Sequence, residues 1–368
     1  MRIALAPNAF KGRMTALQAE RVMAEAVRAV DPDAEIVALP IADGGDGSLA
    51  MLQANGAGSI RALELGNGLS IPFLALKNGG AVLEVATLVG LHQLSAIPLA
   101  QRTTARVGLA LASLIDQGYR DISICLGGSG TCDYGLGMIG ALGGTCAVRG
   151  MECPLGVDSV READQLNLER VRAKLEGVSV HGLYDAAAPL VGPWGAAQLY
   201  APQKGADPYL VSRLESCGKK LLSLLYSGEE DSSSQPGDGA AGGLGFAIRA
   251  MLGGDLIPGA SALFDLTSLE ARLAGVDILL TGEGRTDRQT LQGKGPATIV
   301  QRARSLGIRC FLVSGSIDLS DRELAGLGLS GWERTGRSGR KPASPAEAAA
   351  DLKVATAALL RRIREKDR

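Results

Sequence analysis

Histidine is almost absent from this chain, which has 2 histidines among 368 residues. His92 and His181 each lie inside an apolar segment, where a packed or exposed imidazole is more common than a catalytic one. No Ser-His-Asp arrangement can be argued from them, and neither has cysteines at the spacing of a zinc site. The 6 cysteines contain no CxxC pair, so we expect buried thiols in a reduced compartment.

The chain also has few aromatic residues and a net charge close to zero. Aromatics make up 4% of the chain, which leaves little surface for stacking single-stranded bases. The 38 Lys and Arg residues balance 39 Asp and Glu, and the net charge of -1 argues against a surface that binds polyanions. We therefore expect no nucleic-acid partner, and any anion site must be local.

Long apolar runs and nucleotide-binding fingerprints are missing. No apolar run reaches the roughly 18 residues of a membrane-spanning helix, and the chain starts with a predicted strand at residues 2–6 where a signal peptide would have an apolar core. We expect a cytoplasmic protein without a membrane partner. No GxxxxGK[ST] motif is present, and GxGxxG matches at residues 135–140 and 237–242 lack a strand directly before them. Neither a Walker-type NTPase nor nicotinamide binding is predicted.

Glycine is the abundant residue, with 50 copies placed mostly at the ends of apolar runs. Predicted strands alternate with helices, which indicates an α/β fold with largely parallel sheets and ligands at the carboxyl ends of strands. Thr15 and Gln18 predict a capping box that opens the first helix. The length suggests two domains, and a change to a short β-meander marks a boundary near residue 60. Residues 228–239 are of low complexity and predict a surface loop.

Charges of both signs follow the predicted strand at residues 276–280. Glu283, Arg285, Asp287 and Lys294 stand there beside Gly282 and Gly284. Glycines let a backbone approach a ligand, cationic side chains bind anionic oxygens, and carboxylates hold a metal ion or accept a proton. The alternative is a polar loop with solvated charges.

A second glycine-rich loop at residues 127–131 lies between a predicted strand and a helix. Such a loop points backbone N–H groups toward an anion, although tight packing of the turn on the sheet is an alternative interpretation. Lys11 and Lys204 stand in loops where a lysine can meet phosphate, and Asp185 follows the predicted strand at residues 178–184.

Together these segments resemble the bacterial type I glycerate kinase family. The matches run in order over most of the chain, at residues 6–12, 42–47, 126–131, 201–206, 236–245, 281–287, 289–294 and 314–316. The resemblance implies transfer of the γ-phosphoryl group of ATP to a hydroxyl of D-glycerate, usually the 2-hydroxyl, so that 2-phosphoglycerate is favoured over 3-phosphoglycerate.

The resemblance also implies two α/β domains, one inserted in the other, with the active site in the cleft between them. We expect a discontinuous domain at residues 1–60 and 275–368 and an inserted, flavodoxin-like domain at residues 61–274. The oligomeric state is not fixed by the sequence, and a homodimer is compatible with it.

Phosphoryl transfer needs alignment of the reactants and neutralisation of oxygen charge, usually with Mg²⁺. On the resemblance we expect catalytic roles for Asp185, Arg285 and Lys294, with Asp185 as the base. Mg²⁺ is expected on Asp43, Glu283 and Asp287. ATP and anionic oxygens are expected at Lys11, Gly44, Gly45, Gly127, Gly128, Ser129, Thr131, Lys204, Gly282 and Gly284.

Two segments depart from the family pattern. Cys132, Asp133, Tyr134 and Gly135 stand where the family commonly has Asn-Asp-Gly-Gly, and the run from Ala186 to Ala188 lacks the polar side chain expected beside Asp185. These departures leave two alternatives open: a kinase of another small hydroxy acid, and a non-catalytic relative that binds a nucleotide or an acidic metabolite.

Overall fold

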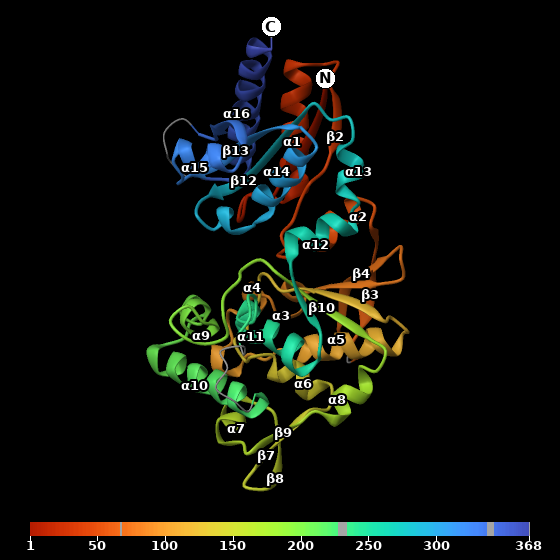
Figure 1. Ribbon diagram of the computed structural model, residues 1–368, viewed down its shortest axis with the longest axis vertical. Coiled ribbons are helices and arrows are strands. Elements are labelled where there is room, and N and C mark those ends of the chain that lie inside the picture. The colour runs from red at the N-terminus through yellow and green to blue at the C-terminus, as the bar shows by residue number, and fades with distance from the viewer. Residues whose placement is uncertain (67, 227–233, 337–341, 368) are drawn as a thin grey trace. The chain divides into compact units, whose positions relative to one another are not determined.

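The computed structural model describes residues 1–66, 68–226, 234–336 and 342–367 (Figure 1). Part of the predicted surface loop at residues 228–239 lies outside the described residues. The chain forms two compact units. Unit 1 comprises Met1–Asp43, Ala50–Ala57 and Ala260–Arg368, and unit 2 comprises Gly44–Leu49 and Gly58–Gly259.

The centre of unit 1 is a five-stranded, fully parallel sheet in the order β14-β13-β12-β1-β2. Leu5 in β1 lies opposite Leu280 in β12, so the first strand of the chain pairs with one that starts far downstream. The strands are β1 (Arg2–Pro7), β2 (Glu35–Ala38), β12 (Ile278–Thr286), β13 (Arg309–Ile317) and β14 (Leu329–Arg334).

Helices cover both faces of this sheet. Because side chains alternate along a strand, Leu5 and Leu280 pack with α1 and α16 on one face, whereas Ala4 and Leu279 pack with α12, α13 and α14 on the other. Figure 1 shows α1 and α16 side by side. The helices are α1 (Ala16–Val30), α2 (Ser48–Ala54), α12 (Gly259–Leu266), α13 (Leu269–Leu273), η5 (Thr290–Gln292), α14 (Gly295–Ser305), α15 (Asp321–Gly326) and α16 (Pro345–Lys366).

Unit 2 contains a six-stranded sheet in the order β11-β10-β6-β5-β4-β3. Neighbours from β11 to β5 are parallel, and β3, β4 and β5 are antiparallel, which confirms the predicted meander. A small antiparallel sheet has the order β8-β7-β9. The strands are β3 (Gly58–Glu64), β4 (Ser70–Leu76), β5 (Ala81–Glu84), β6 (Asp121–Cys125), β7 (Thr145–Val148), β8 (Met151–Pro154), β9 (Gln165–Asn167), β10 (Ser179–Tyr184) and β11 (Asp255–Pro258).

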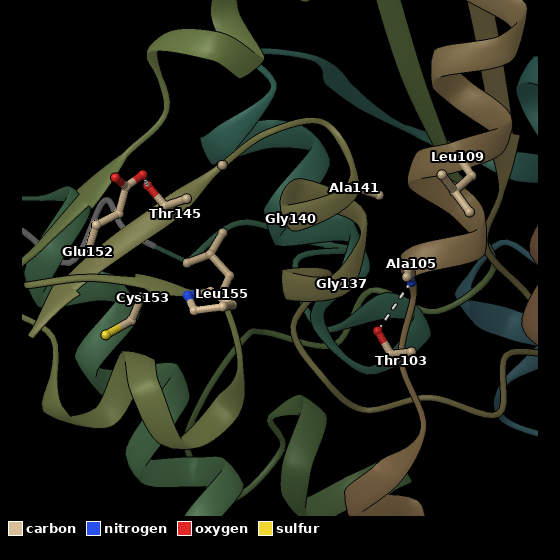
Figure 2. Close-up of a pocket in the computed structure, with 12 residues that line it drawn as sticks. Thr103, Ala105, Leu109, Gly137, Gly140, Ala141, Thr145, Glu152, Cys153 and Leu155 are labelled. Carbon is tan, nitrogen blue, oxygen red and sulfur yellow. Dashed lines mark hydrogen bonds between the residues drawn. The ribbon is translucent and has the colours of Figure 1, made fainter.

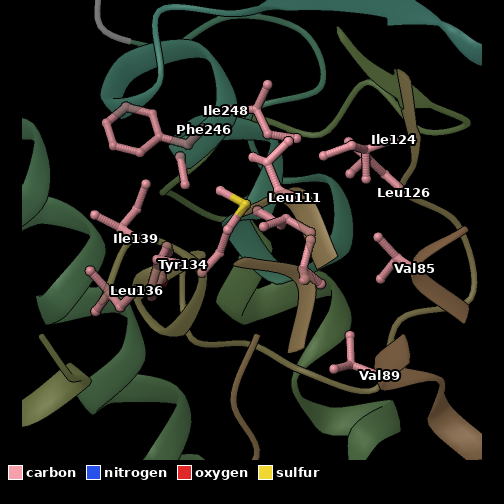
Figure 3. Packing of buried hydrophobic residues seen from close by; sticks show 14 of the residues in the cluster. Val85, Val89, Leu111, Ile124, Leu126, Tyr134, Leu136, Ile139, Phe246 and Ile248 are labelled. Atoms are coloured by element: carbon pink, nitrogen blue, oxygen red, sulfur yellow. The ribbon is translucent and has the colours of Figure 1, made fainter. Parts of the chain in front are cut away.

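One large core holds unit 2 together (Figure 3). Leu111 of α5, Ile124 of β6 and Phe246 of α11 are fully buried in it, as is Tyr134 after the glycine loop. The helices are α3 (Val85–Val89), α4 (Leu91–Leu94), η1 (Leu99–Gln101), α5 (Ala105–Asp116), α6 (Leu136–Ala141), α7 (Val157–Glu162), α8 (Glu169–Lys174), α9 (Ala196–Tyr200), η2 (Pro202–Lys204), α10 (Pro208–Leu225), α11 (Ala240–Phe246) and η4 (Ala247–Met251).

The expected α/β class with largely parallel sheets is confirmed, and so is the capping box of Thr15 and Gln18. The last segment of unit 1 starts at Ala260, earlier than the expected residue 275, because Phe264 and Leu273 bury their side chains in the core of unit 1. No helix in the described ranges is long and apolar enough to cross a membrane.

Candidate functional site

In unit 2, the glycine loop at residues 127–131 follows β6 and packs directly on a second glycine turn. The Gly127 amide donates to the Gly44 carbonyl at 2.9 Å. A Cβ atom at Gly127 would lie 2.6 Å from the Gly45 Cα atom, so only glycine permits this approach. Gly44 itself has a φ of 92°, in the left-handed region. The two loops that the sequence singled out therefore form one surface of unit 2.

Hydrogen-bond donors in this loop are left without partners. Within the described ranges, the backbone amides of Gly128, Ser129 and Thr131 have no acceptor, and the buried Thr131 hydroxyl has no partner. Buried donors without partners are costly, and successive free amides in a turn make an anion-binding concavity. This loop can therefore receive an anionic group.

Lys204 at the end of η2 supplies a positive charge to the same loop. Its ammonium donates to the Ser129 hydroxyl at 3.0 Å and to the Thr131 carbonyl at 2.7 Å. The pKa of Lys204 is lowered from 10.5 to about 8, chiefly by burial; the Arg102 charge also lowers it, whereas Cys132 and Asp133 oppose the shift. A bound anion would favour the charged ammonium.

Asp185 lies just after β10, in the neighbourhood of Tyr200. Burial raises the pKa of Tyr200 to about 12, and the Asp185 charge contributes to this rise. The Lys204 ammonium lies 5.8 Å from the centre of the Tyr200 ring. Asp185 and Lys204 thus both lie near Tyr200 in unit 2.

Glu84, the last residue of β5, is a component that sequence reasoning missed. Its buried carboxylate accepts hydrogen bonds from the Gly47 amide at 3.0 Å and the Leu49 amide at 3.1 Å. Burial raises the pKa of this carboxyl group. The signal in the sequence is a single acid between the apolar residues of 81–89. Glu84 holds the turn that packs on Gly127.

The glycine-rich segment at residues 236–245 supports the loop from behind. A Cβ atom at Gly242 would lie 2.3 Å from the Thr131 carbonyl oxygen, and the Gly242 carbonyl accepts from the Tyr134 amide at 3.1 Å. The segment is anchored by Asp238, which is fully buried and accepts two hydrogen bonds from Arg249. These glycines serve backbone packing.

In unit 1, Asp43 and Glu283 form a separate carboxylate cluster. The buried Asp43 accepts from the Asn8 side-chain amide at 3.2 Å. Glu283 accepts from the hydroxyls of Thr290 at 2.8 Å and Thr286 at 3.0 Å. The pKa of Glu283 is raised to about 7, chiefly by burial and also by the Asp43 charge, while the two threonine hydrogen bonds and the Lys294 charge oppose the rise.

Lys294 stands at the N-terminus of α14, beside this cluster. It is the N-cap residue and makes no side-chain cap, so the first amides of α14 stay open to a ligand. Its ammonium donates to the Gln289 side chain at 2.7 Å. A Cβ atom at Gly295 would lie 3.3 Å from the Asn8 side-chain nitrogen, which places Asn8 against the start of the helix. A helix N-terminus with a lysine favours anionic ligands.

The other predicted residues of unit 1 lie nearer to solvent or serve the backbone. Arg285 is exposed and pairs with Asp318 at 2.7 Å and with Asp287 at 3.5 Å. Asp287 also accepts from the Gln289 amide at 2.9 Å. Lys11 is exposed.

Gly282 and Gly284 permit close packing of the backbone in unit 1. A Cβ atom at Gly282 would lie 2.3 Å from the Val313 carbonyl oxygen of the neighbouring strand. At Gly284, a Cβ atom would lie 3.3 Å from the Lys11 backbone nitrogen. Gly282 thus serves the pairing of β12 with β13, and Gly284 lets the Lys11 turn lie against β12.

Two neighbouring carboxylates in unit 1 are suited to bind Mg²⁺: Asp43 and Glu283. No group of three or more His, Cys, Asp or Glu side chains that could hold a metal ion is found in the described part of the chain, so Asp287 does not complete a three-carboxylate site with them. Mg²⁺ commonly uses only one or two protein carboxylates together with substrate phosphates and water. Asp43 and Glu283 fit that donor set.

Comparison with known proteins shows the family of the chain. The sequence model described as "Glycerate kinase family" matches residues 3–364. The chain belongs to the glycerate kinase family. This is a family of phosphotransferases, so the expected family and enzyme class are confirmed.

Individual glycerate kinases match over most of their length. A glycerate kinase of Halalkalibacterium halodurans is 33% identical over 331 residues, which cover 86% of this chain and 85% of that protein. The glycerate 2-kinase of Escherichia coli K12 is 30% identical over 329 residues, covering 86% of each chain. A crystal structure assigned as glycerate kinase 2 from Salmonella typhimurium LT2 has a TM-score of 0.79 at 28% identity and covers 99% of both chains.

Both departures from the glycerate kinase pattern lie in unit 2. Tyr134 has a φ of 56° and a fully buried ring, so it fills the core while Asp133 keeps its contacts with backbone amides of α6. Ala188 is buried and its carbonyl accepts from the Gly239 amide at 2.9 Å. The departures therefore affect packing behind the candidate site of this glycerate kinase family member.

A wide groove of about 630 Å³ lies elsewhere in unit 2 (Figure 2). It runs between α5, α6 and the hairpin of β7 and β8, and its lining includes Leu109, Ala141 and Cys153. None of the residues predicted for phosphoryl transfer lines it.

Proposed function

We propose that this protein transfers the γ-phosphoryl group of ATP to the 2-hydroxyl of D-glycerate and forms 2-phosphoglycerate. The observation that carries the proposal is the buried Lys204 on a glycine loop with open amides, in a member of the glycerate kinase family. The similarity to a glycerate 2-kinase of Escherichia coli supports the 2-hydroxyl. The 6 free thiols support a reduced compartment, which we take to be the cytoplasm.

The glycine loop of unit 2 fits the phosphates of ATP. The amides of Ser129 and Thr131 and the unpartnered Thr131 hydroxyl supply neutral donors, and Lys204 supplies the charge. Since the phosphates carry negative charge, their binding would satisfy these donors and favour the ammonium form of Lys204. The Gly127 amide holds the loop on the Gly44 carbonyl.

Cationic groups of unit 1 suit the carboxylate of glycerate or a phosphate oxygen. Lys294 and the first amides of α14 supply donors on a rigid helix. Arg285 can form two parallel hydrogen bonds with a carboxylate when it leaves Asp318. Lys11 is an exposed cation on the neighbouring turn. We assign substrate positioning to these residues.

Mg²⁺ is the metal we propose, with Asp43 and Glu283 as its protein ligands. When bound, the ion neutralises charge on the transferred phosphoryl group. A nearby cation would favour the ionised form of Glu283, whose pKa burial raises to about 7. Thr286 and Thr290 keep the carboxylate in position through their hydroxyls.

Asp185 is the residue we propose to orient and deprotonate the substrate hydroxyl. It stands at the carboxyl end of a parallel strand, where α/β proteins place ligands. Its proximity to Tyr200 places it in the same part of unit 2 as Lys204.

An ADP-release assay with Mg²⁺ tests the proposal across D-glycerate, L-glycerate and tartronate, with the phosphorylated position assigned by NMR. We expect turnover with D-glycerate and phosphate on the 2-hydroxyl. Turnover with another acid alone would reassign the substrate. Binding of ATP, measured by thermal shift, without ADP release from any acid would instead indicate a non-catalytic relative.

A further inference from the structure

A second, more enclosed pocket of about 330 Å³ lies behind the glycine loop in unit 2. It is formed where the segment before α5, the start of α6, the connection from β8 to α7, and α10 meet. Its lining shares Thr103, Gly137 and Leu155 with the groove in Figure 2, so the two spaces adjoin. No residue assigned above to phosphoryl transfer lines it.

Arg102 is a buried cation in the wall of this pocket, with 8% of its surface exposed. Its Nε donates to the Ile97 carbonyl at 2.7 Å and its Nη1 to the Gly130 carbonyl at 3.0 Å. Nη2 makes no hydrogen bond within the described ranges and keeps some exposure to solvent, and no carboxylate there lies within 4.0 Å of the guanidinium. A buried charge without a counter-charge is costly unless a ligand supplies one.

The remaining charges of the pocket are already paired. Arg213 donates to Asp158, which also lies 3.5 Å from Arg161. The Asp133 carboxylate accepts from the Thr104 amide at 2.8 Å, the Thr104 hydroxyl at 3.0 Å, and two amides at the start of α6. Burial raises the pKa of Asp133, and these hydrogen bonds oppose the rise. Arg102 is therefore a cation of the pocket that has no carboxylate partner in the described chain.

We propose that this pocket binds a small organic acid, with its carboxylate on Nη2 of Arg102 and a short apolar chain against the opposite wall. The lining is mixed, and its apolar part comes from five side chains: Leu99 and Leu214 are buried, and Leu155, Val157 and Leu210 are half-buried. A pocket of this volume is at the small end of ligand sites, which combine apolar walls with few polar anchors. A branched carboxylate of about five carbons matches both features.

A carboxylate bound in this pocket would act on the glycine loop at residues 127–131 through Arg102. The Arg102 guanidinium donates to the Gly130 carbonyl, and the Lys204 ammonium donates to the carbonyl of the next residue, Thr131. Since the Arg102 charge acts on Lys204, its neutralisation by a bound carboxylate would strengthen the ammonium form of Lys204. This coupling rests on the proposed kinase function, whereas the binding itself does not.

Methyl NMR of the full chain tests the binding without any measurement of activity. The probe is isovalerate, and isovaleramide, which has the same shape and no charge, is its control. We expect isovalerate to shift the methyl signals of Leu99, Leu155, Leu210 and Leu214, and to bind about tenfold to hundredfold more tightly than the amide. Equal affinity of acid and amide, or no shift of these methyls, would overturn the proposal.

Substitutions of Arg102 test whether the carboxylate of isovalerate binds to this side chain. Arg102→Met should abolish the preference for acid over amide, while Arg102→Lys should keep part of it and Arg106→Gln, an exposed change on α5, should keep all of it. If Arg102→Met does not fold, the comparison of acid and amide on the unmodified protein still decides. Inorganic phosphate that binds as tightly as isovalerate would overturn the requirement for an apolar chain.

Discussion

The Lys204 ammonium lies 3.0 Å from the Ser129 hydroxyl and 2.7 Å from the Thr131 carbonyl, although these residues are far apart in sequence. Its positive charge thus sits inside the loop whose amides remain open. Lys204 is the best-supported residue of the candidate site, because its contacts, its burial and its lowered pKa all fit a role in binding an anion.

Changes at Lys204 should alter both activity and the pH dependence of stability. Lys204→Met should lower kcat/KM for ATP about 100-fold or more, since a charge-assisted contact is lost. In the free enzyme, kcat/KM should fall as the pH rises through about 8, where the ammonium loses its proton. A profile that stays flat up to pH 10 would contradict the assignment.

The same pKa predicts a change in stability of known sign. The folded pKa of about 8 lies below the ordinary value of 10.5, so the unfolded chain binds more protons between these values. The free energy of unfolding contributed by Lys204 should therefore rise with pH from about 8 to about 10.5. Urea unfolding across this range should show the rise in the unmodified protein and its loss in Lys204→Met.

Glu84→Gln should weaken the turn that packs on the glycine loop. The carboxylate accepts amides from Gly47 and Leu49, and a neutral amide is a weaker acceptor. We expect a loss of about 1–3 kcal/mol in the free energy of unfolding, together with a raised KM for ATP. Glu64→Gln, on an exposed strand position, is the matched control. Unfolding and kinetics equal to those of the control would refute this role.

Gly242→Ala should damage the fold of unit 2. The new Cβ atom would lie 2.3 Å from the Thr131 carbonyl oxygen, and the φ of 69° disfavours any residue except glycine. We expect a loss of at least about 2 kcal/mol. At Gly140 a Cβ atom meets nothing within 4 Å, so Gly140→Ala in α6 should be neutral or stabilising. Thermal unfolding compares the stability of Gly242→Ala with that of Gly140→Ala.

Asp43→Asn and Glu283→Gln should each weaken metal binding. Because two carboxylates share the proposed Mg²⁺, loss of either should raise the metal concentration for half-maximal turnover about tenfold to hundredfold. Electron paramagnetic resonance of Mn²⁺ bound with a non-hydrolysable ATP analogue measures the same loss without turnover. Asp33→Asn, at an exposed position, is the control. Unchanged Mn²⁺ affinity in both variants would remove these residues from the metal site.

Asp185→Asn should lower kcat by about 100-fold to 10,000-fold if Asp185 assists proton transfer. Because the Asp185 charge contributes to the raised pKa of Tyr200, the variant should also lower that pKa from about 12 while burial keeps it above 10.0. Spectroscopic titration of tyrosine reports this second effect. Near-full turnover with an unchanged pH profile would exclude Asp185 as the base.

Several features could be predicted from the sequence because their causes are local. Apolar runs predicted where the strands lie, and Thr15 with Gln18 predicted the cap of α1. The predicted strand end at residue 280 was wrong, because β12 continues through Gly282 and Gly284 to Thr286. Ordered motifs pointed to the glycerate kinase family, which the comparisons confirm. The glycine loop at residues 127–131 was recognised as a candidate anion site for the same local reason.

Other features depend on which distant segments become neighbours. The order of strands places β12 beside β1 and so brings Glu283 near Asp43, and burial there, together with the Asp43 charge, raises the pKa of Glu283 to about 7. Glu84 was missed, and the packing role of Gly242 was not predicted, because their partners, Gly47 and Thr131, lie on other elements. Sequence periodicity determines which faces of a strand or helix are apolar. Tertiary packing decides which polar group each buried charge meets, and therefore its ionisation.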